Sequence, residues 1–254
     1  MIVALTCAAA ALMAPQASKG PEIFNKMLQR YYAANTVKGT FELVQTAVGS
    51  ETAKVRVATS LQVAKPNKVF LEQVRIPRST EPEVRNHFSA VSDGQQISYT
   101  VPRDMLPFGS RDRVWEAAPA TISQCLDMVV PLTIDRSLPL AVSFYNVYEI
   151  NEFSKKVSAL QFVDETNYDG KSAYRLKADY AIMNVKVGST VQPVRIPAYI
   201  FIDKEYNLIG IAYEETIAQE NLRVKITSQW VVRLTVDGPV DAALFVVPKT
   251  SADR

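Results

Sequence analysis

Residues 222–236, LRVKITSQWVVRLTV, alternate apolar and polar side chains almost without a break. The apolar positions are Leu222, Val224, Ile226, Trp230, Val232, Leu234 and Val236. A period of two places these side chains on one face of a β-strand and the polar side chains on the other. A sheet with one apolar and one wet face is typical of antiparallel pairing. The chain must therefore build an antiparallel sheet and cover one side of it with apolar groups.

The same alternation recurs in two blocks of the sequence. The predicted strands and hairpins are 41–48, 52–63, 69–76, a hairpin around Asp93-Gly94, a hairpin around Asp169-Gly170, and a hairpin over 197–216. Asp-Gly between alternating apolar runs is a strong signal for a tight hairpin turn. The blocks are separated by residues 102–113, which have the composition of a loop, and by an apolar segment that breaks the two-residue rhythm.

Three segments have the spacing of helices instead. Residues 21–36 carry apolar side chains three and four positions apart, and residues 120–130 and 137–150 do so between the two blocks of strands. Strands before and after a central helical insert favour one large sheet with the helices on its concave side. We predict an α+β fold: an incomplete, curved antiparallel β-barrel of about 10–11 strands whose concave side is covered by helices.

The N-terminus indicates export. Residues 1–14, MIVALTCAAAALMA, carry no charge and are almost wholly apolar. The run is shorter than the roughly 20 residues of a membrane-spanning helix and fits the apolar region of a secretory signal peptide. We predict a cleaved signal peptide over 1–18, a single domain over 19–254, and a periplasmic location. An uncleaved anchor and a lipid attached at Cys7 are the alternatives.

Composition excludes several classes of function. The chain has 28 basic and 26 acidic side chains, and this near-balance argues against nucleic acid as a partner. With one histidine and two cysteines, no metal site and no cofactor is expected. His87 lies in a predicted strand with no nucleophile motif nearby, and Cys125 lies in an apolar segment typical of a buried core residue. We therefore predict a binding protein and not an enzyme, although carboxylates meeting from distant strands would leave catalysis open.

The alternation also identifies the side chains that face the concave side. Helices laid over such a face can leave a cavity for an apolar ligand. The predicted lining is Phe41, Leu43, Val55, Val57, Leu61, Leu71, Ile97, Tyr99, Ile200, Ile202, Val224, Ile226, Trp230 and Val232. The predicted helical lid is Ile122, Leu126, Val129, Leu140 and Phe144. Periodicity shows which side faces inward but not whether that side is full, so plain core packing is the alternative for each residue.

Six segments in this order resemble the LolA/LolB lipoprotein-carrier superfamily, in particular its branch of predicted periplasmic proteins. They are MLQRYYAANTVKGTF, LQVAKPNKVFLE, VSDGQQISYTVP, RVWEAAPATISQCLDMVV with SLPLAVSFY, NYDGKSAYRLKADY, and AYIFIDKEYNLIGIAYEE. The sequence departs from the group at Lys65, where an arginine often precedes the turn. The resemblance implies an incomplete barrel with a hydrophobic cavity for the acyl chains of lipids or lipoproteins.

The resulting hypothesis is an exported, soluble, monomeric carrier of lipid or lipoprotein acyl chains. A membrane-anchored donor or acceptor protein is a candidate partner. The alternative is an envelope protein-interaction or sensor module on the same fold, in which the cavity is filled and no ligand binds.

Overall fold

The computed structural model describes residues 7–49, 51–76, 87–101, 113–129, 132, 153–187, 189–219 and 222–249. Its strands are β1 (Thr36–Val48), β2 (Thr52–Ala64), β3 (Lys68–Ile76), β4 (His87–Ser92), β5 (Gln96–Thr100), β6 (Arg113–Ala117), β7 (Val157–Tyr168), β8 (Lys171–Val187), β9 (Thr190–Asp203), β10 (Leu208–Gln219) and β11 (Leu222–Val236). The helices are α1 (Cys7–Ala33), α2 (Ile122–Val129), α4 (Phe153–Lys156) and the 3₁₀ turn η4 (Ala242–Phe245).

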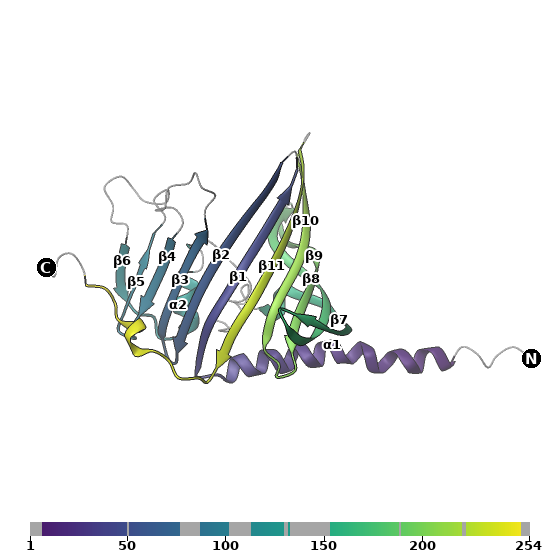
Figure 1. The fold of residues 1–254 in the computed structure, drawn as a ribbon, viewed down its shortest axis with the longest axis horizontal. Helices are drawn as coiled ribbons and strands as arrows, with labels where there is room; N and C mark the ends of the chain where they lie inside the picture. The colour runs from purple at the N-terminus through teal and green to yellow at the C-terminus, as the bar shows by residue number, and fades with distance from the viewer. Residues whose placement is uncertain are drawn as a thin grey trace, which may run out of the picture.

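All eleven strands form one antiparallel sheet in the order β6-β5-β4-β3-β2-β1-β11-β10-β9-β8-β7. The two halves of the chain meet where β1 pairs with β11, from Val37 opposite Val236 to Val48 opposite Lys225. Within each half, strands that follow one another in sequence are neighbours in the sheet, as short hairpin connections require. The edge strands β6 and β7 are not paired to each other, so the sheet is open (Figure 1). This confirms the predicted α+β class and the incomplete, curved antiparallel sheet.

Helix α1 covers one face of the sheet, here called the inner face. Ile23, Phe24, Met27, Leu28 and Tyr31 form its buried stripe, at the three- and four-residue spacing expected from the sequence. The helix runs past the lower ends of the strands, and its N-terminal part extends beyond β7 (Figure 1). The packing of this stripe joins α1 to the sheet in a single hydrophobic core.

A glycine allows α1 to approach the edge strand closely. A Cβ atom at Gly20 would lie 2.8 Å from the backbone nitrogen of Phe162 and 3.0 Å from the carbonyl carbon of Gln161. Both atoms belong to the backbone of β7, so neither can move aside as a flexible side chain would. The helix therefore approaches the backbone of β7 to a distance that only glycine permits.

The opposite face, here called the outer face, is crossed by the C-terminal segment. Asp241 and Gln62 on β2 exchange two hydrogen bonds of 2.7 and 2.9 Å through the backbone of Asp241. Phe245 is buried beside β3 and β4, and the Trp115 indole on β6 donates to the Pro248 carbonyl at 2.7 Å. The segment thus holds the first-half strands on the side away from α1.

The structure differs from the sequence expectation at three boundaries. Helix α1 begins at Cys7 instead of Pro21 and ends at Ala33, and β1 starts five residues before Phe41, at Thr36. Strand β6 was not predicted, because its five residues carry no clear alternation and gain their order by pairing with β5. The second predicted lid helix, residues 137–150, lies outside the described residues.

Candidate functional site

Every predicted lining residue lies on the inner face, because the strand register places these residues beside one another. Leu43, for example, is opposite both Val57 on β2 and Trp230 on β11. The buried members are Phe41, Leu43, Val57, Leu61, Leu71, Ile97, Tyr99, Ile200, Ile202, Trp230 and Val232. Most of them pack against α1, α2 or each other in the main core. This part of the inner face is therefore filled by the protein's own side chains.

The remaining lining residues, Val55, Val224 and Ile226, are only partly buried. Val55 packs against the edge of the main core, whereas Val224 and Ile226 lie beyond the core as far as the chain is described. The register places all three at the same end of the sheet. At this end β1 continues into β2, and β10 continues into β11. The inner face thus changes from a filled core to partly exposed apolar surface along the length of these strands.

Polar and aromatic side chains lie at this transition. The Gln45 amide donates to Ser228 Oγ at 3.1 Å, and further into the filled core, where both residues are buried, the Gln73 amide donates to Thr59 Oγ1 at 3.0 Å. The ring centroids of Tyr213 and Trp230 are 5.3 Å apart. Each pair is hydrogen-bonded between neighbouring strands, and all four side chains are neutral.

Helix α2 supplies the described part of the predicted lid. Ile122, Leu126 and Val129 are buried in the main hydrophobic core. The Asn67 side chain donates to the carbonyls of Gly94 and Pro119 at 2.9 and 2.8 Å, which ties the turn before α2 to two hairpins. In addition, the Ile122 N–H donates to the Pro66 carbonyl at 2.8 Å. The start of α2 is therefore held to the sheet. The other predicted lid residues, Leu140 and Phe144, lie outside the described residues.

Cys125 is a buried residue of α2, as its apolar segment indicates. Burial raises the pKa of its thiol to about 11. The thiolate, which is the reactive form, is accordingly scarce at neutral pH.

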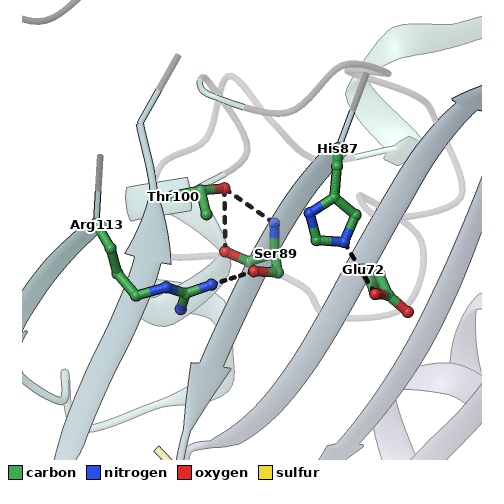
Figure 2. Close-up of polar contacts among 5 residues, drawn as sticks. All are labelled: Glu72, His87, Ser89, Thr100 and Arg113. Atoms are coloured by element: carbon green, nitrogen blue, oxygen red, sulfur yellow. Dashed lines mark hydrogen bonds and ion pairs between the residues drawn. The ribbon is translucent and has the colours of Figure 1, made fainter. Parts of the chain in front are cut away.

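His87 lies on the outer face, at the start of β4. Its Nε2 is 2.9 Å from Glu72 Oε1 on β3. Ser89, two residues further along the same strand, instead accepts a hydrogen bond from Arg113 on β6. Figure 2 shows this row of polar side chains across β3 to β6. Within the part of the chain that the structure describes, His87 and Ser89 form no hydrogen bond with each other.

The sequence analysis did not single out Arg113, Ser98 or Thr100. Alternation on β4 and β5 places Ser89, Ser98 and Thr100 on one face, and the Asp93-Gly94 hairpin brings the two strands together. Arg113 could not be added from sequence, because the pairing of β6 with β5 follows a loop-like segment that gives no register. Over the described ranges, no group of three or more His, Cys, Asp or Glu residues could hold a metal ion.

The matches found among known proteins are structural, and their sequence identities with this chain are low. No family model and no curated protein matches the sequence. Among solved structures, LprF from Mycobacterium bovis matches at 13% identity, over 88% of this chain and 98% of that one, with a TM-score of 0.35. The LolA superfamily protein NE2245 from Nitrosomonas europaea matches at 9% identity, over 90% and 97%, with a TM-score of 0.31.

A third match is the MucA/MucB complex of Pseudomonas aeruginosa, at 10% identity, over 92% of this chain and 62% of that one, with a TM-score of 0.38. The class itself is defined by the sheet: an open antiparallel half-barrel with an apolar inner face covered by helices. No described helix has both the length and the apolar character needed to cross a membrane.

Proposed function

We propose that the protein is an exported, cell-envelope binding protein that holds an acyl chain on the inner face of its half-barrel. The observation that carries the proposal is the partly exposed apolar surface of Val55, Val224 and Ile226, which continues the buried core along β1, β2 and β11. A ligand seated there would extend an existing core without the need to create a new one.

The hydrophobic effect favours this class of ligand. Each methylene group moved from water into an apolar site contributes about 0.8 kcal/mol, so a long acyl chain gains several kcal/mol even when part of it stays exposed. The neighbouring Gln45 side chain is only partly buried, and it has a second amide hydrogen and a carbonyl oxygen besides its bond to Ser228, so it can hydrogen-bond an ester or amide next to the acyl chain. The polar group beside the acyl chain is neutral, so the proposed ligand needs no charge at this point.

Export and a soluble carrier role complete the proposal. The uncharged, apolar residues 1–14 support a signal peptide, and the near-neutral charge of the chain supports an apolar cargo over nucleic acid. A membrane-anchored donor or acceptor would deliver or remove the acyl chain.

Native mass spectrometry tests the proposal on protein expressed into a bacterial periplasm. Extra mass that is removed by organic extraction and identified as lipid is the expected result. A clean apoprotein mass, together with no uptake of a fluorescent fatty acid, would contradict it and favour the protein-interaction module.

A matched pair of substitutions locates the binding surface. Val224→Asp places a carboxylate on the partly exposed inner surface and should abolish uptake of the fluorescent fatty acid. Val74→Asp makes the same change on β3 at an outer-face position that is 40% exposed, and should leave uptake unchanged. Equal uptake by the two variants, with thermal melts that show both are folded, would place the ligand elsewhere.

A further inference from the structure

The outer face carries a row of polar side chains that the proposed acyl-binding surface does not use. Strand pairing aligns Glu72 with Ser89 and Thr100 with Arg113, and the Ser89 N–H donates to Thr100 Oγ1 at 3.0 Å. The row therefore runs across four neighbouring strands, from β3 to β6 (Figure 2).

Arg113 is partly buried in this row and its described partners are neutral. One terminal nitrogen donates to Ser98 Oγ at 3.1 Å and the other to Ser89 Oγ. Ser98 is fully buried and Ser89 is 8% exposed, so the Arg113 guanidinium is bound from the side of the sheet by two buried hydroxyl groups. Burial lowers the pKa of Arg113, because the surroundings disfavour its charge.

Three other arginines on the same face each pair with a carboxylate. Arg56 pairs with Glu42, Arg175 with Asp164 and Arg233 with Asp169. Among the described residues, no carboxylate pairs with Arg113. Hydroxyl groups satisfy its donors but cannot balance its charge, whereas a bound anion would do both.

The nearest acidic residue in the row is itself engaged. Glu72 is 2.9 Å from His87, whose ring lies between Glu72 and Ser89 in Figure 2. The second ring nitrogen of His87 is on the Ser89 side of the ring in Figure 2. Arg113, Ser89 and His87 thus bring a guanidinium, a hydroxyl and a ring nitrogen to neighbouring positions on the outer face.

We propose that Arg113, Ser89 and His87 form a binding site for a phosphate group on the outer face. Guanidinium and hydroxyl donors together suit the several oxygens of a tetrahedral phosphate. The site is on the opposite side of the sheet from the acyl-binding surface and does not depend on it. The phosphate group is either free in solution or part of a lipid headgroup.

The test is a chemical-shift titration of the ¹⁵N-labelled full chain with inorganic phosphate at constant ionic strength, set with chloride. Saturable shifts at the amides of Ser89, Thr100 and Arg113 are expected. Arg113→Gln should weaken phosphate binding about tenfold or more, the effect of losing a hydrogen-bonded charge. Arg56→Gln removes an arginine from the same face and should leave the affinity unchanged.

Three outcomes would overturn the proposal: no saturable shift, normal binding by Arg113→Gln, or equal weakening in Arg56→Gln. If Arg113→Gln does not fold, Ser89→Ala replaces it. That variant keeps the charge but removes a hydroxyl that holds the guanidinium, so it should weaken binding, and unchanged binding would count against the site.

Vesicles distinguish the two sources of phosphate. Co-sedimentation with phosphatidylglycerol-containing vesicles that is lost in Arg113→Gln, and absent with phosphatidylcholine alone, would assign a lipid headgroup. Saturable phosphate binding without co-sedimentation would assign a free phosphate.

Discussion

The phenolic oxygen of Tyr31 on α1 accepts a hydrogen bond of 3.2 Å from the backbone N–H of Leu208, the first residue of β10. Both residues are buried, with exposed fractions of 1% and 0%. The two are 177 positions apart in sequence, so this bond ties the N-terminal helix to the second half of the sheet. It also satisfies a buried strand N–H next to the point where the pairing of β10 with β9 becomes irregular.

Tyr31→Phe should destabilise the protein although it keeps the aromatic ring. The Leu208 N–H would remain buried without an acceptor, at a cost of about 1–3 kcal/mol. Urea unfolding measures the loss. Tyr199→Phe is the matched control. Tyr199 is 41% exposed, so removal of its hydroxyl group should change the free energy of unfolding little. Equal urea midpoints for Tyr31→Phe and the unmodified chain would contradict this, because the Leu208 N–H would then have found another acceptor, such as water.

Gly20→Ala should also destabilise, against the trend for helices. Alanine raises helix propensity by about 1 kcal/mol over glycine. At Gly20, however, the new Cβ would lie 2.8 Å from the Phe162 nitrogen and would force α1 away from β7. We expect a net loss of about 1–3 kcal/mol, read from thermal melts. Gln29→Ala, on the exposed side of α1, should be nearly neutral, and a stabilised Gly20→Ala would refute the close approach.

Asn67→Ala should loosen the attachment of α2. The change removes both amide hydrogen bonds, to Gly94 and Pro119, at a buried position. A loss of about 1–3 kcal/mol is expected, together with faster hydrogen exchange in α2 and in the β4–β5 hairpin. Asn25→Ala, at an exposed position of α1, serves as the control. Faster exchange spread evenly over the chain would argue against a local attachment.

Stability should fall at alkaline pH because of Tyr168. Burial raises the pKa of this phenol to about 12, and its hydroxyl donates to the Trp230 carbonyl at 2.8 Å. The folded state holds the proton more tightly than the unfolded state, where the pKa is about 10. The resulting stability is therefore complete below pH of about 10 and is lost as the pH rises toward about 12.

Urea unfolding at a series of pH values between about 9 and 12 measures this loss. In Tyr168→Phe the decline should be shallower by about 1.4 kcal/mol per pH unit, the value for one titrating group. Tyr199→Phe, on the exposed side of β9, should keep the original slope. An unchanged slope in Tyr168→Phe would assign the decline to the other buried phenols, Tyr31 and Tyr99.

Local patterns in the sequence determined the strands and their inward faces. The alternation over 222–236, the Asp-Gly turns and the stripe of α1 each depend on neighbours in sequence, and the structure places Val232, Leu61 and Met27 in the core as those patterns require. The pattern within each segment was enough to identify its inward side, because a strand with one apolar face must turn that face toward the core.

Tertiary structure alone decided which surfaces stay open and which charges stay unbalanced. Val224 and Val232 have the same place in the alternation, yet only Val232 is buried, because coverage depends on helices distant in sequence. Arg113 meets Ser89 only because β6 pairs with β5 after a segment of loop-like composition. Long-range packing and register therefore decide which part of the predicted inner face stays open and where Arg113 lies, and alternation within one segment shows neither.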